Sequence, residues 1–189
     1  RAYYTALIGK WHLGHDDSLP TMRGFDYFYG TPYSHDEGYP GPFPMALIWP
    51  PIPLHEHERI IQQPVDMTTI TRRMTTRAIE VMEQSVAREQ PFFLYVAYHE
   101  PHIPAFADPD FEGKSLRGRF GDMMEQMDDS IGEIMARVKS LGIDDNTMVL
   151  FTSDNGAWPE AQEPFSAKGE SNTSILFFHY PNSSSLFIS

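Results

Sequence analysis

Five apolar segments divide the chain and predict its fold. Residues 3–8, 92–97 and 147–152 are short, nearly continuous runs of aromatic, β-branched and aliphatic side chains, as in buried strands. Over residues 66–88 and 119–140, apolar residues recur at helical spacing, and the first of these segments opens with an aspartate, a common N-cap residue. The order strand, helix, strand, helix, strand predicts an α/β fold with a mostly parallel sheet flanked by helices.

The remaining segments show no such periodicity. Residues 14–64 are rich in Pro, Gly, His and aromatic residues, which predicts a long loop region with a candidate short strand at 45–49. Within it, the run of His and Glu at 55–58 resembles a metal cluster, but no predicted strand end presents it. We therefore interpret that run as solvated loop. Residues 161–189 lose clear periodicity, and we expect a divergent, poorly ordered tail after a domain of residues 1–160.

Composition narrows the possible functions. The formal net charge of -12 argues against binding to a nucleic-acid backbone, although a local cationic pocket could still hold a small anion. The chain has no cysteine, which excludes disulfides, thiolate metal sites and a cysteine nucleophile. No apolar run reaches the roughly 18 residues that a membrane span needs. Because the chain starts at Arg1 within an expected strand, we interpret it as a fragment of a longer protein.

Polar side chains follow each of the three predicted strands. The carboxyl ends of parallel strands share one edge of the sheet, where ligands bind in open α/β folds. We therefore expect three pairs to converge there: Lys10 with His12, His99 with His102, and Asp154 with Asn155.

These residue types suggest anion binding, proton transfer and a hard cation. Lys10 offers a positive charge and His12 can move a proton near neutral pH. Asp154 and Asn155 offer oxygen ligands suited to calcium or magnesium. Taken alone, the Asp-Asn-Gly sequence also fits a plain turn, and histidines in a Pro-rich loop, such as His102, are more often structural.

An ordered series of motifs makes the chain similar to a known family. Residues 9–14, Gly-Lys-Trp-His-Leu-Gly, resemble the second signature of the sulfatase family, of the arylsulfatase A and arylsulfatase G type. The resemblance continues in family order through six further stretches, at residues 23–26, 30–36, 91–95, 101–104, 118–122 and 151–156.

The resemblance implies a partial alkaline-phosphatase-like sulfatase domain over residues 1–160, from an enzyme of the secretory pathway, lysosomal or extracellular. The parent would hydrolyse an aryl or carbohydrate sulfate ester. Lys10 and His12 would hold a formylglycine hydrate and the sulfate, and His102 would donate a proton to the leaving oxygen. Ser34 and His35 match the substrate-pocket loop. Asp154 and Asn155 would bind one calcium ion.

The chain also departs from the family pattern. The Cys/Ser-x-Pro-x-Arg motif that yields formylglycine is absent, as is an Asp-Asp pair that completes the metal site. Ser18 is a near miss with its arginine one residue late, and we reject it as a nucleophile. We therefore expect an incomplete calcium site and no turnover by this chain alone. His99 is expected only to shape its loop.

Two alternatives stay open at this point. A phosphoester or phosphonate hydrolase on the same scaffold would need further Asp and His ligands for two transition metals. A non-catalytic binder of sulfated glycans, or an inert truncated product, would need no nucleophile.

Overall fold

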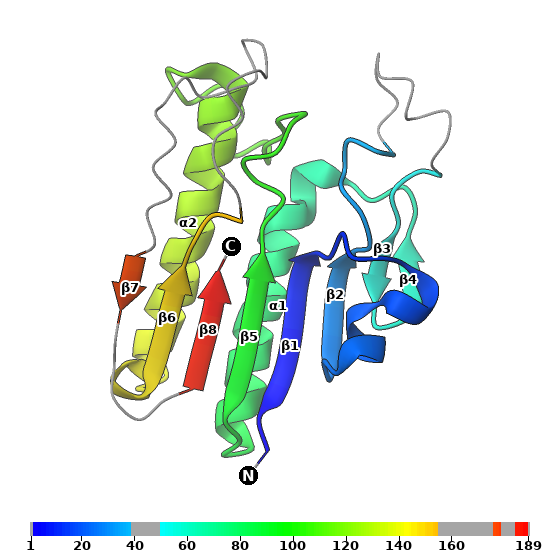
Figure 1. The fold of residues 1–189 in the computed structure, drawn as a ribbon. Helices are drawn as coiled ribbons and strands as arrows, with labels where there is room; N and C mark the ends of the chain where they lie inside the picture. Colours follow the sequence, from blue (N-terminus) through cyan, green and yellow to red (C-terminus); the bar gives the residue numbers. More distant parts are fainter. Residues whose placement is uncertain (1, 39–49, 155–175, 179–183, 189) are drawn as a thin grey trace.

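An eight-stranded mixed sheet forms the centre of the molecule (Figure 1). The computed structural model describes residues 2–38, 50–154, 176–178 and 184–188. The strands are β1 (Tyr4–Lys10), β2 (Tyr27–Thr31), β3 (Leu54–Glu56), β4 (Arg59–Gln62), β5 (Phe92–Ala97), β6 (Thr147–Phe151), β7 (Leu176–Phe178) and β8 (Ser184–Ile188). Their order across the sheet is β4-β3-β2-β1-β5-β8-β6-β7.

The middle of the sheet is parallel, as predicted. Strand β1 pairs in parallel with β2 and β5, and β8 pairs in parallel with β5 and β6. Strands β3 and β4 extend one side by antiparallel pairing, and β7 pairs antiparallel to β6 at the other. The carboxyl ends of β1, β5 and β6 therefore lie at one edge of the sheet (Figure 1).

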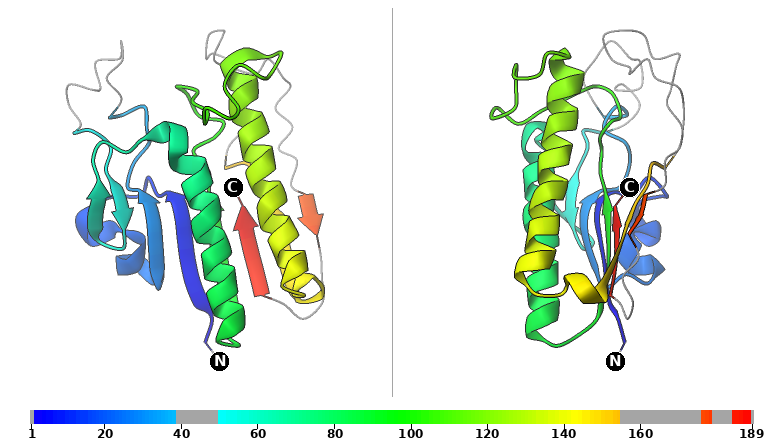
Figure 2. Two further views of the ribbon diagram at one scale, coloured as in Figure 1. Left: turned by 180° about the vertical axis from the view of Figure 1, so that it is seen from behind. Right: turned by 90° about the vertical axis from the view of Figure 1, so that its left-hand side faces the viewer.

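Two long helices cover one face of the sheet, as the right-hand view in Figure 2 shows. They are α1 (Met67–Ala87) and α2 (Gly118–Ser140), within about two residues of the predicted ranges. Asp66 caps α1 as expected, since its carboxylate accepts from the amide of Thr68 at 3.0 Å. Buried apolar residues of both helices, such as Met74 and Ile134, share one core with Ile8 of β1.

A smaller apolar cluster lies on the opposite face. Leu7 of β1 and Phe28 of β2 are fully buried there against Leu19. Leu19 joins two short 3-10 helices, η1 (Asp16–Ser18) and η2 (Pro20–Arg23), which lie on this face in Figure 2. A further short helix, η4 (Asp144–Asn146), precedes β6.

The prediction of one long loop over residues 14–64 was wrong in part. The region contributes strands β2, β3 and β4 to the sheet, because an aromatic run (27–29) can pair with β1 despite the surrounding prolines. The interpretation of residues 55–58 as solvated loop was also wrong for His55. His55 lies in β3 and is only 8% exposed, with its ring centroid 6.2 Å from that of Phe28. The candidate strand at 45–49 lies outside the described residues.

The tail contributes strands that its sequence pattern did not predict. Strand β8 lies between β5 and β6, and β7 lies at the edge beside β6. The other residues of 155–189 lie outside the described part of the chain.

Two glycines allow the backbones of β1, β2 and β5 to approach closely beside the first motif. Gly9 has a φ of +122°, and a Cβ there would lie 1.8 Å from the carbonyl oxygen of Ala97. A Cβ on Gly30 would lie 1.8 Å from the carbonyl oxygen of Gly9. Side chains at both positions are therefore excluded, and Lys10 follows at a fixed place on the sheet edge.

Candidate active site

Three strand ends bring a lysine, a threonine and a histidine together. Lys10 ends β1 and is the register partner of Thr31, which ends β2. His99 follows β5 by two residues, and its Nε2 lies 2.9 Å from the Thr31 hydroxyl. Thr31 and His99 are buried and Lys10 is half-buried. The local fold thus places one cation near a buried polar pair.

The loop after β2 supplies the candidate substrate-binding residues. Ser34 and His35 are both about 1% exposed. Among the described residues, neither the Ser34 hydroxyl nor Nδ1 of His35 has a hydrogen-bond partner. Nε2 of His35 donates to the carbonyl of Pro104 at 3.1 Å, which ties this loop to the segment after β5. Buried polar atoms without partners are uncommon and often mark functional sites.

Three imidazole rings form a cluster around His35. Its ring centroid lies 5.8 Å from that of His99 and 5.5 Å from that of His102, both in edge-to-face orientation. Phe106 packs edge-on against His35 at 5.0 Å. The candidate proton donor His102 therefore lies at the same edge as the first motif, in contact with the loop that carries Ser34.

The two inner imidazoles are held neutral. Burial lowers the pKa of His35 to about 4, and the nearby charges of His102 and Lys10 act in the same direction. Burial also lowers the pKa of His99 well below its usual value, reinforced by His35 and Lys10. Near neutral pH the cluster therefore adds hydrogen-bonding capacity without adding buried charge.

Two consecutive acidic residues, Asp36 and Glu37, face His102 and His12. Oδ1 of Asp36 lies 3.9 Å from Nδ1 of His102, and Oε1 of Glu37 lies 3.5 Å from Nε2 of His12. Nδ1 of His102 also donates to the carbonyl of Ile103 at 2.7 Å. In neutral His102 the lone pair is therefore on Nε2, which is the nitrogen free for proton transfer.

Sequence reasoning did not find these acidic partners. The pairing of Asp36 with His102 joins two loops that are distant in sequence, so no local spacing encodes it. The place of Thr31 in the site could not be predicted either, because only strand register places it beside Lys10. The sole available hint was that Asp36 and Glu37 adjoin the loop that carries Ser34.

The loop that presents His102 is anchored by a buried glutamate. The Glu100 carboxylate accepts hydrogen bonds from the Thr71 hydroxyl of α1 and, at 3.3 Å, from the Gln126 amide of α2. Burial raises the pKa of Glu100, and these hydrogen bonds oppose that rise. The anchor joins both helices to the segment between His99 and His102.

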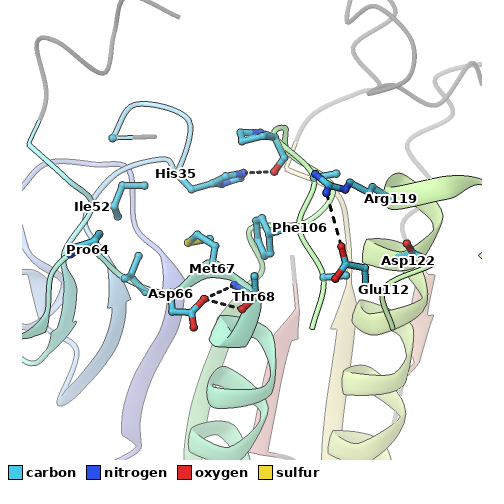
Figure 3. Close-up of a pocket in the computed structure, with 15 residues that line it drawn as sticks. His35, Ile52, Pro64, Asp66, Met67, Thr68, Phe106, Glu112, Arg119 and Asp122 are labelled. Carbon is cyan, nitrogen blue, oxygen red and sulfur yellow. Dashed lines mark hydrogen bonds and ion pairs between the residues drawn. The ribbon is translucent and has the colours of Figure 1, made fainter. Parts of the chain in front are cut away.

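A pocket of about 390 Å³ lies beside the cluster (Figure 3). His35 and Phe106 line one side of the pocket, and the apolar side chains of Ile52 and Met67 also line it. Arg119, which forms an ion pair with Glu112 at 3.8 Å, lies on the α2 side. The pocket shares His35 with the imidazole cluster, so the two features adjoin.

The candidate metal residues are only partly described. Asp154 lies exposed just beyond the carboxyl end of β6, on the predicted edge. Asn155 lies outside the described residues. In the part of the chain that the structure describes, no three His, Asp or Glu side chains are placed to hold a metal ion. No helix of that part is both long and apolar enough to cross a membrane.

The fold and the site define a class: an α/β protein with a cationic, histidine-rich site at the carboxyl edge of its parallel strands. The sulfatase family model matches residues 1–183. The chain belongs to the sulfatase family.

Named relatives agree with this assignment. The chain is 38% identical to N-acetylgalactosamine-6-sulfatase of Mus musculus over 160 residues, which cover 82% of this chain and 31% of the relative. It is 36% identical to arylsulfatase A of Homo sapiens over 172 residues, with 82% and 34% coverage. The chain thus spans about a third of the length of these relatives.

A solved structure shares the fold. The PsFucS1 sulfatase from Pseudoalteromonas sp. superposes with a TM-score of 0.76 at 28% identity, covering 87% of this chain and 37% of that one. The predicted fold class and family resemblance are therefore confirmed.

Proposed function

We propose that this chain is part of a sulfuric ester hydrolase and forms one wall of its active site. The observation that carries the proposal is the convergence of Lys10 with the cluster of His35, His99 and His102 at one sheet edge. Membership of the sulfatase family gives this convergence its chemical meaning.

Each side chain has a role that its geometry permits. Lys10 binds the sulfate as a cation, and the buried Ser34 hydroxyl donates to a sulfate oxygen. His12 lies on the same edge and holds or releases a proton near the reacting group. His102, with Nδ1 committed to the Ile103 carbonyl, protonates the departing alcohol oxygen from Nε2 once Nε2 has itself taken up a proton, that is, as the imidazolium. His35 orients His102 through their edge-to-face ring contact.

Sulfatases as a family use a formylglycine nucleophile and a metal ion that offsets the sulfate charge. For this chain we propose one calcium ion, bound by Asp154 and Asn155. Asp154 is an exposed carboxylate at the correct edge, which suits a hard cation, but the described residues supply only this one ligand. The described residues therefore form only part of a calcium site.

The substrate class follows from the relatives. One is named for an N-acetylgalactosamine sulfate and others are arylsulfatases. We propose an aryl or carbohydrate sulfate ester as the substrate, in a protein of the secretory pathway.

The test is to measure the binding of inorganic sulfate to the purified 189-residue chain by isothermal titration calorimetry. We expect Lys10→Ala to weaken sulfate binding about tenfold, since loss of a partly buried charge contact costs about 1.4 kcal/mol. Lys114→Ala, at an exposed lysine over Phe111, is the matched control and should change nothing. Equal sulfate affinity in wild type and Lys10→Ala would contradict the proposal. A two-metal phosphoesterase would instead require zinc or manganese to bind its anion.

A further inference from the structure

His99 forms the buried centre of the site, although its sequence suggested only a loop residue. It is 1% exposed and lies between Thr31 on one side and His35 on the other. The ring centroid of Phe106 lies 6.5 Å from that of His99. None of the roles proposed above uses His99 or Thr31.

The hydrogen-bond directions in this cluster are determined by the partners. The Thr31 hydroxyl has one proton, and it donates that proton to the carbonyl of Tyr33 at 3.0 Å. The Thr31 oxygen must therefore accept from Nε2 of His99, at 2.9 Å. His99 accordingly carries its proton on Nε2 and a lone pair on Nδ1, which has no partner among the described residues.

The same argument determines the tautomer of His35. Its Nε2 faces the carbonyl of Pro104 at 3.1 Å, and a carbonyl can only accept. His35 therefore also has its proton on Nε2 and an unpartnered Nδ1. Both rings are neutral near pH 7, because burial and the charge of Lys10 lower both pKa values.

We propose that Thr31 and His99 are positioning residues, which hold His35 and, through its ring, the reactive His102 at a fixed distance from Lys10. Thr31 is the register partner of Lys10, so the series Thr31, His99, His35, His102 begins beside the cation and ends at the proton donor. Each link is a hydrogen bond or an edge-to-face ring contact. The proposal deepens the proposed function and rests on Lys10 and His102 being its reacting groups.

The first experiment reads the His99 tautomer by long-range ¹H–¹⁵N NMR of the 189-residue chain. We expect the wild-type spectrum to show the Nε2–H form. Thr31→Val keeps the shape but removes the acceptor, so the His99 signals should lose this defined pattern and those of His102 should shift. Thr31→Ser retains a hydroxyl and should restore both. Thr147→Val also removes a buried threonine hydroxyl, but at the start of β6, at the sheet edge away from the site. This control should leave the His99 and His102 signals unchanged.

A second pair of variants separates the hydrogen bond from packing. In His99→Gln, the amide nitrogen can still donate to Thr31, and we expect sulfate affinity within about twofold of wild type. His99→Leu fills similar space without a donor, and affinity should fall about five- to tenfold. Equal effects of these two variants, or an unchanged His99 pattern in Thr31→Val, would overturn the proposal. If wild type binds no sulfate, the proposed function fails, while the nitrogen signals of His99 and His102 still decide the positioning role.

Discussion

Oε1 of Glu37 lies 3.5 Å from Nε2 of His12, although His12 follows β1 and Glu37 follows β2. His12 has a φ of +53°, a conformation that is uncommon for a residue other than glycine. Its amide donates to the carbonyl of Pro32 at 3.0 Å, so both its backbone and its side chain are tied to the segment after β2. This segment therefore orients the second residue of the Lys10–His12 pair.

Glu37→Gln should destabilise the chain slightly. The variant removes the carboxylate that faces His12, and half-exposed ion pairs contribute about 0.2–1 kcal/mol. We expect the melting temperature to fall by about 1–4 °C, measured by circular dichroism. Glu125→Gln, at an exposed glutamate of α2, is the control. The same loss in a chain that already carries His12→Gln would show that the carboxylate acts through something other than His12.

Most of the regular core could be predicted from the sequence, because local patterns encode it. The strand at 92–97 and both helices are recognisable from apolar spacing alone, and Asp66 identifies the start of α1. Strands β3 and β4 are three and four residues long and lie among prolines, so they carry too little local pattern. Strand β8 depends on insertion between β5 and β6, which is a non-local event.

The positions of the site residues could be predicted only where a sequence motif contains them. Lys10 and His102 do lie at one edge of the sheet, as the parallel strands required. Thr31 could not be found, because its role depends on register with Lys10. The roles of the predicted site residues all stay predictions, and Asn155 lies outside the described residues.

Gly9→Ala should destabilise the fold severely. The new Cβ would lie 1.8 Å from the Ala97 carbonyl oxygen, which belongs to a central strand and cannot move aside cheaply. Together with the strained φ of +122°, this should cost more than about 3 kcal/mol, measured by urea unfolding. Gly24→Ala is a matched control, because Gly24 has a φ of +106° but no atom within 4 Å of its would-be Cβ. It should cost only about 1–2 kcal/mol; similar losses would refute the close-approach argument.

Buried His35 should make the chain less stable as the pH falls. Its folded pKa of about 4 lies below the ordinary value of 6.5, so the unfolded chain binds a proton more readily between these pH values. The free energy of unfolding from this group is therefore intact above pH 6.5 and falls by roughly 2 kcal/mol down to pH 5. In His35→Gln this part of the slope should vanish in urea titrations at pH 7, 6 and 5. His15→Gln, at an exposed imidazole, should retain it.

Glu100 should have the opposite pH dependence. Its folded pKa is raised above the ordinary 4.5, so the folded chain holds the proton more tightly and stability decreases as the pH rises above 4.5. Glu100→Gln keeps the oxygen that accepts from Thr71 and Gln126 and cannot ionise. We expect the variant to gain stability relative to wild type between pH 4.5 and 8, with Glu133→Gln as the exposed control. A constant difference across this range would argue against a buried carboxylate charge.

The 189-residue chain should bind sulfate without hydrolysing an aryl sulfate. Lys10, His12 and His102 can hold the anion and move protons, but the covalent route of sulfatases needs a formylglycine. The chain has no cysteine to oxidise. Ser18 does not replace it, because this serine ends η1, outside the imidazole cluster, and its hydroxyl accepts from Arg23 at 2.9 Å. Direct attack by water would also lack charge stabilisation by a metal ion, because the described residues do not form a complete set of metal ligands.

The measurement is release of 4-nitrophenol from its sulfate ester, with calcium present, by wild type and Lys10→Ala. We expect both rates to equal the rate without protein, while sulfate binding still distinguishes the two proteins. Turnover that disappears in Lys10→Ala would show that this chain contains its own nucleophile. Ser34 would then be the first residue to substitute, because its hydroxyl is buried in the loop beside His35 and has no partner among the described residues.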